Sequence, residues 1–88
     1  MNDIEVRAVV LATLKSIAPE LEEPALREDR PLRLQVDLDS IDWLNFLLRL
    51  HDRLKVEIPE SDYQRLVTLA DIVNYLVARV SAPHKSGR

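Results

Sequence analysis

Apolar residues recur at helical spacing in three long segments of the chain. Residues 2–18 place them three or four positions apart, which lines one face of an α-helix, and Pro19 ends that segment. Residues 40–54 and 69–80 repeat this pattern. The sequence therefore predicts three long amphipathic helices. The apolar stripe of the first helix consists of Val6, Val10, Leu14, Ile17 and Leu21.

Two capping patterns lie between the second and third of these segments. Ser61–Gln64 has the spacing of a capping box, in which two side chains satisfy the free amides at a helix start. This pattern predicts a short helix from Ser61 to about Leu66. Thr68–Asp71 repeats the spacing at the start of the last long helix.

The first connection, residues 19–38, is long for a chain of 88 residues. It is rich in proline and charge, so we expect a loop that its own apolar side chains hold down. The fold class that follows is all-α, a small four-helix bundle with three long helices, one short helix and this long first loop. We expect residues 1–82 to form the domain and residues 83–88 a flexible C-terminal tail. The leucines expected to pin the loop are Leu21, Leu26, Leu32 and Leu34.

The helix predicted for residues 40–54 has an apolar arc of roughly 220°, wider than one core contact needs. We assign the face that includes Trp43 and Phe46 to the core. The other face consists of Ile41, Leu44 and Leu48, and two alternatives stay open for it: burial under the loop or short helix, or a patch for a partner. The predicted core comprises Val10, Leu14, Ile17, Trp43, Leu47, Leu50, Leu54, Ile72, Val73 and Leu76.

Composition and charge exclude several classes of site. The chain has no cysteine, and therefore no disulfide and no thiolate for catalysis or metal binding. Its net charge is −3, and residues 19–42 hold eight carboxylates against three arginines, which disfavours nucleic acid as a partner. Neither His51 nor His84 has a second histidine at ligand spacing, so we predict no metal site. No apolar run reaches the roughly 18 residues of a membrane span, so we expect no membrane partner and a cytoplasmic protein.

Ser40 lies where a polar loop turns into the second long helix. If Asp39 caps this helix, its carboxylate accepts a free amide and leaves the Ser40 hydroxyl unbonded. An anion esterified to that hydroxyl would lie against unpaired N–H groups at the positive end of the helix dipole. The position suits a serine that carries a phosphate-linked group, although Asp-Ser before an apolar run is also an ordinary helix start.

Three short motifs together resemble the acyl carrier protein family. They are Asp39-Ser40-Ile41-Asp42 at the helix start, Val56-Glu57-Ile58-Pro59 after that helix, and Thr68-Leu69 before the last helix. The resemblance implies that Ser40 carries a 4′-phosphopantetheine arm, transferred from coenzyme A by a phosphopantetheinyl transferase. The thiol of this arm would hold acyl groups as thioesters. The resemblance therefore implies a carrier and not an enzyme, with no catalytic residue of its own.

The residues around this serine are the candidates for partner recognition. Asp39 and Asp42 look like the carboxylates that a phosphopantetheinyl transferase reads. An enzyme that loads or processes the acyl group must dock beside the modified serine, where an apolar patch is expected. The patch consists of Ile41, Leu44 and Leu48.

Two departures from the family pattern bear on the pathway. The family usually has glycine two residues before its aspartate, and here that position is Asp37. The second long helix has few acids, and Arg49 and Arg53 interrupt them, which weakens steering toward basic partners. We therefore favour a monomeric carrier of a specialised polyketide, lipid or peptide pathway over the fatty-acid carrier. The alternative is a non-catalytic helical protein-binding module without a prosthetic group.

Overall fold

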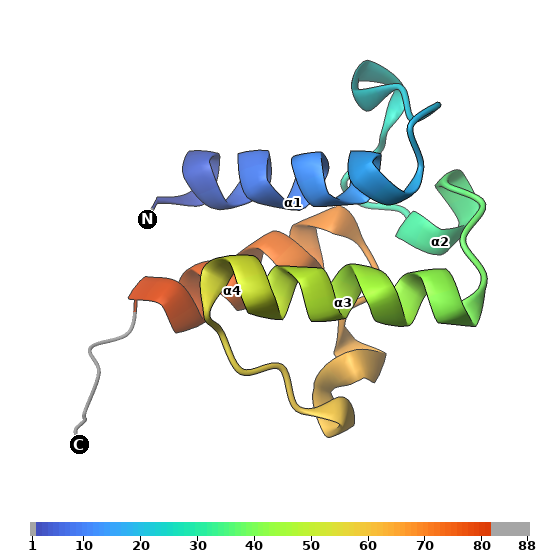
Figure 1. Cartoon of the computed structure of the whole chain (residues 1–88). Coiled ribbons are helices and arrows are strands. Elements are labelled where there is room, and N and C mark those ends of the chain that lie inside the picture. The colour runs from blue at the N-terminus through green and yellow to red at the C-terminus, as the bar shows by residue number, and fades with distance from the viewer. Residues whose placement is uncertain (1, 82–88) are drawn as a thin grey trace.

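Six helical elements follow one another along residues 2–81, the part of the chain that the computed structural model describes (Figure 1). They are α1 (Asp3–Ile17), the 3₁₀ helix η1 (Glu23–Ala25), α2 (Leu32–Gln35), α3 (Ser40–Leu54), the 3₁₀ helix η2 (Glu60–Arg65) and α4 (Leu69–Ser81). Three of them are long, as predicted, and the all-α bundle is confirmed. The tail predicted for residues 83–88 lies outside the described residues.

The core lies where α1 packs against both α3 and α4, with α4 behind α3 in the view of Figure 1. Eight of the ten predicted core residues are buried there, and Phe46 and Val6 join them with no exposed surface. Ile17 and Leu54, also predicted as core residues, are only partly buried and pack against the edge of this core. Both lie in the last turn of their helices, where fewer neighbours cover a side chain.

The first connection is folded more tightly than the predicted loop. It contains η1 and α2, and it is bonded to the start of α4. The Leu32 amide donates to the Val67 carbonyl at 2.8 Å, and the Ala70 amide donates to the Glu28 carbonyl at 3.2 Å. Leu32 is fully buried and pins the segment as expected, but Leu34 is 83% exposed and pins nothing. Because α2 is helical, residues two apart point in different directions, which turns Leu34 outward.

One of the two predicted capping boxes forms and the other does not. Thr68 and Asp71 exchange two hydrogen bonds, at 3.0 and 3.1 Å, as a capping box requires. Ser61 was expected to cap a helix, but η2 begins one residue earlier, after Pro59, and no side chain caps it. The turn forms instead through the Asp62 amide, which donates to the Pro59 carbonyl at 2.9 Å. An i→i+3 bond of this kind gives a 3₁₀ helix.

Asp62 holds η2 against α4. Its carboxylate accepts a 2.6 Å hydrogen bond from the Tyr75 hydroxyl and a 3.2 Å bond from Arg79. The Arg79 guanidinium also lies 4.4 Å from the centre of the Tyr75 ring, a cation–π distance. Burial of the phenol, followed by its hydrogen bond to Asp62, raises the pKa of Tyr75 to about 12. This cluster keeps η2 bonded to α4.

Candidate functional site

Ser40 is the first residue of α3, and its hydroxyl is free. The Asp39 carboxylate accepts a 2.8 Å hydrogen bond from the Asp42 amide, which makes Asp39 the predicted N-cap. The Asp39 carbonyl accepts the Trp43 amide at 2.9 Å and so begins the helix. Ser40 is exposed, and its hydroxyl makes no hydrogen bond within residues 2–81. The oxygen is therefore accessible to a modifying enzyme.

The start of α3 can accept a phosphodiester on Ser40. The amides of Ser40 and Ile41 lie in the first turn, where a helix has no internal acceptor for them. The aligned peptides of this 15-residue helix also put a partial positive charge at this end. A phosphate-linked group on the hydroxyl therefore fits the residues present, since both features favour an anion there.

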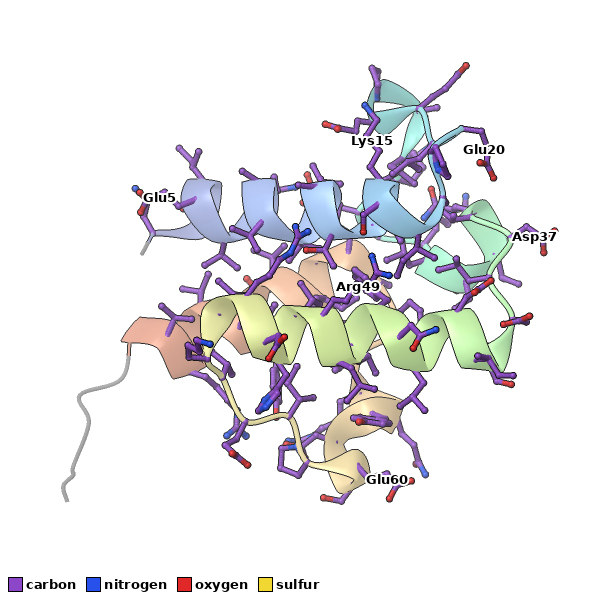
Figure 2. The ribbon with its side chains drawn as sticks, in the orientation of Figure 1. Glu5, Lys15, Glu20, Asp37, Arg49 and Glu60 are labelled. Carbon is purple, nitrogen blue, oxygen red and sulfur yellow. The ribbon has the colours of Figure 1, made fainter. Side chains whose placement is uncertain are left out.

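The carboxylates near Ser40 do not act on the hydroxyl. Asp39 is committed to the cap, and Asp37 points away from the bundle (Figure 2). Acids beside a phosphodiester repel it, so they suit helix capping and recognition by a partner. Within the described part of the chain, no three His, Asp or Glu side chains are arranged to hold a metal ion. His51 instead bonds the Val56 carbonyl through Nδ1 at 2.8 Å, just beyond the end of α3.

The apolar patch predicted on α3 is exposed. Ile41 is 70% exposed, Leu44 43% and Leu48 50%, so neither the first connection nor η2 covers them. The sequence left open whether these residues are buried under the loop or short helix or form a patch for a partner, and the structure excludes their burial. We call these three residues the outer face of α3.

Arg49 and Arg53, which interrupt the acids of α3 in the sequence, are both bonded to α1. Arg49 donates a 2.9 Å hydrogen bond to the hydroxyl of Ser16, and Arg53 donates a 3.2 Å bond to that of Thr13. Both acceptors belong to α1, and Figure 2 shows Arg49 in the space between α1 and α3. The two arginines therefore join α3 to α1.

A hollow of about 420 Å³ opens beside Leu38, two residues before Ser40, and the sequence did not predict it. Arg33 is the one charged residue in its lining. The lining combines α2 with the junction of η2 and α4, segments far apart in the sequence, so no local pattern could have revealed it. The lining residues are Pro31, Arg33, Leu34, Leu38, Leu66 and Val67.

Comparison with known proteins agrees with this geometry. The family profile described as "Phosphopantetheine attachment site" matches residues 8–76. An acyl carrier protein of Campylobacter fetus subsp. fetus is 32% identical over 72 residues, which is 82% of this chain and 87% of that protein. The chain belongs to the acyl carrier protein family.

Two solved structures of acyl carrier proteins have a similar fold. One is a solution structure from Anaplasma phagocytophilum that is described as an acyl carrier protein. It has a TM-score of 0.81 at 27% identity, and the match covers 94% of this chain and 97% of that chain. The acyl carrier protein of Enterococcus faecalis has a TM-score of 0.71 at 25% identity, with coverage of 90% and 99%. The bundle predicted from sequence is therefore the fold of the family.

Membership of the acyl carrier protein family confirms several predictions. The protein is a carrier and not an enzyme, and its cofactor is a covalently attached 4′-phosphopantetheine. Its family's partners are a phosphopantetheinyl transferase and biosynthetic enzymes.

None of the helices in residues 2–81 combines the length and apolar character that a membrane span needs.

Proposed function

We propose that Ser40 is the attachment serine and that this acyl carrier protein holds acyl intermediates as thioesters on its arm. The observation that carries the proposal is the free, exposed hydroxyl at the first position of α3, beside the Asp39 cap. When bound, the arm supplies a thiol that the chain itself lacks, since the sequence has no cysteine. Thiol chemistry on this protein therefore depends on the arm.

The residues of the chain position the hydroxyl, and the transferase activates it. Ser40 Oγ forms a bond to the phosphorus of coenzyme A that bears the pantetheine. The bond from this phosphorus to the adenosine bisphosphate breaks, and the transferase takes the serine proton. Asp39 fixes the first turn of α3, so the hydroxyl is held at a rigid helix start. Asp39 and Asp42 supply carboxylates that the transferase recognises, and the outer face offers Ile41, Leu44 and Leu48 for docking.

We favour a specialised polyketide, lipid or peptide pathway over fatty-acid synthesis, with a monomeric carrier in the cytoplasm. Asp52 is the acid that follows the outer face along α3, and Asn45 is uncharged. A partner would therefore gain more from apolar contact with Leu44 and Leu48 than from charge steering.

Labelling with a fluorescent coenzyme A analogue tests the attachment site. A promiscuous phosphopantetheinyl transferase should label the wild-type protein once, and Ser40→Ala should abolish labelling. The matched control is Ser61→Ala, which removes another exposed serine and should label normally. Far-ultraviolet circular dichroism should be the same for all three proteins, because neither hydroxyl bonds another described residue. Labelling that survives in Ser40→Ala would show that another residue carries the arm.

Intact mass separates the carrier from the alternative, a helical protein-binding module without a prosthetic group. Co-expression with the transferase should add the mass of one phosphopantetheine to the wild-type chain and none to Ser40→Ala. A wild-type chain that gains no mass would favour the protein-binding module, for which the outer face of α3 would be the docking surface.

A further inference from the structure

A backbone hydrogen bond joins the two sides of the hollow. Leu38, in its wall, is two residues before Ser40, and α2 forms one side. The opposite side, Leu66 and Val67, is joined to α2 by the 2.8 Å bond from the Leu32 amide to the Val67 carbonyl. This bond links α2 directly to the opposite side of the hollow. A volume of about 420 Å³ is within the range of sites that hold small ligands, roughly 300–1,000 Å³.

The lining is apolar except for one cation. Five of the six lining residues have hydrocarbon side chains, and Leu34 and Val67 are 83% and 44% exposed. Such surface favours contact with the methylene groups of a ligand. Arg33 supplies the single charge, and its guanidinium can donate two parallel hydrogen bonds to a carboxylate.

Arg33 is held in place but has no anionic partner. Its guanidinium carbon lies 5.9 Å from the centre of the Trp43 ring, within cation–π distance. Trp43 is three residues after Ser40 in α3, so the two residues lie on neighbouring turns of the helix. Among the described residues no carboxylate pairs with Arg33, whereas Arg7, Arg65 and Arg79 each form an ion pair. A cation that is oriented and unpaired can receive an anion.

Arg33 is exposed, so a simple alkyl group in this hollow would leave its charge to water and without an anionic partner. An acyl group that ends in a carboxylate would place its methylenes on the leucines and its charge on Arg33. We propose that the cargo of this carrier is a dicarboxylic acyl group whose terminal carboxylate pairs with Arg33 in the hollow. This inference rests on the proposed attachment at Ser40.

Loading one acid and its neutral analogue onto the arm tests the pairing. The promiscuous transferase is given the coenzyme A thioester of adipic acid, ¹³C-labelled at the far carboxyl, or the matching methyl ester. In this transfer Ser40 Oγ bonds to phosphorus and the adenosine bisphosphate leaves, so the thioester stays intact. The pKa of the adipyl carboxyl is then measured by ¹³C NMR in wild type, Arg33→Gln and Arg30→Gln.

A positive charge beside the carboxyl lowers its pKa. We expect the value in wild type to be about 0.2–0.7 pH units lower than in Arg33→Gln, the range for a partly exposed ion pair. Arg30→Gln is the matched control, because Arg30 is an exposed arginine of the same connection that does not line the hollow. It should leave the pKa at the wild-type value. Asp37 and Asp39 are present in all three proteins, so their effect on the pKa of the adipyl carboxyl is the same in each.

A second measurement reports where the cargo lies. The amide NMR signals of Leu66 and Val67 should differ between the acid-loaded and ester-loaded proteins in wild type, and should not differ in Arg33→Gln. Arg33→Lys keeps the charge but loses the paired donors, and it should give an intermediate pKa. It also replaces Arg33→Gln as the test if the glutamine variant is misfolded by circular dichroism.

Several results would overturn the inference. The same carboxyl pKa in wild type and Arg33→Gln would mean that no pair forms, and an equal effect of Arg30→Gln would mean that the whole connection acts as a diffuse charge. If Arg33→Gln alters the ³¹P spectrum of the unloaded holo-protein and leaves the carboxyl pKa unchanged, Arg33 binds the phosphodiester of the arm. Failure of the wild-type protein to gain any mass would refute attachment at Ser40, and this inference with it.

Discussion

The two apolar faces of α3 differ in what they contact, although their residues are chemically alike. The inner face packs on α1 and belongs to the buried cluster that includes α4: Phe46 and Leu50 have no exposed surface, and Leu47 has 1%. The outer face keeps Leu44 and Leu48 at 43% and 50% exposed. Burial against the core stabilises the fold, whereas an exposed leucine one turn from Ser40 is available to a partner. One helix thus has a buried structural side and an exposed side that we propose for docking.

Polar residues of α3 bond it to α1. Arg49 and Arg53 reach across to the hydroxyls of Ser16 and Thr13 on α1. These bonds set α1 against one flank of α3. On the far side, η2 is bonded to α4 through Asp62. The outer face therefore stays uncovered because its neighbours are bonded elsewhere.

Truncation of the inner face should have the largest effect on the free energy of unfolding. Leu47→Ala removes a side chain that is 1% exposed and should lower that free energy by about 2–5 kcal/mol. The matched control is the next residue, since Leu48→Ala removes the same atoms from the outer face and should cost less than about 1 kcal/mol. Urea unfolding followed by circular dichroism measures both. Equal losses would mean that the outer face is part of the core.

Removal of the bond that holds η2 to α4 should have a smaller effect. Tyr75→Phe keeps the ring and deletes the hydroxyl that donates to Asp62 at 2.6 Å, so we expect a loss of about 0.5–1.5 kcal/mol. Tyr63→Phe is the control, because no hydrogen bond of the Tyr63 hydroxyl is found in residues 2–81. Thermal unfolding at neutral pH measures both variants. An unchanged stability of Tyr75→Phe would mean that the bond contributes nothing net.

The same bond predicts a dependence on alkaline pH. The pKa of Tyr75 rises from 10.0 in the unfolded chain to about 12 in the folded protein, so the neutral phenol is favoured by folding. Its contribution is therefore complete below pH 10 and is lost as the pH rises through about 12. Wild type and Tyr75→Phe should converge in stability over this interval. A constant difference between them from pH 9 to 12 would contradict the raised pKa.

The long elements could be predicted from sequence because their signals are local. Apolar spacing located α1, α3 and α4, and the Asp39 cap and the Thr68–Asp71 box placed two of their starts. The position of Ser40 at the first residue of α3 follows from the same local rules.

The remaining features carry no recognisable signal in the local sequence pattern. The Gln35 side chain bonds Arg27 and Arg30 and so shapes the first connection, but nothing in the local pattern singles out this glutamine. The end of α3 uses Lys55 in a left-handed conformation at φ 57°, a role usually filled by glycine. The direction of Arg49 depended on α1, 33 residues away in sequence. Long-range partners of this kind decide which way a polar side chain points.

Substitution on the outer face should change stability least and function most. Leu44→Asp places a charge on an exposed position, so the free energy of unfolding should change by no more than about 1 kcal/mol. A cognate enzyme that buries Leu44 would lose an apolar contact and desolvate a carboxylate, so we expect transfer of cargo to slow by about tenfold or more. Asp52→Ala, the control for charge steering, should slow transfer by no more than about fivefold. Steady-state transfer rates of the holo-proteins measure both, after amide spectra have shown that each variant is folded. If Leu44→Asp transfers normally while Asp52→Ala fails, charge governs recognition, and the preference for a specialised pathway loses its support.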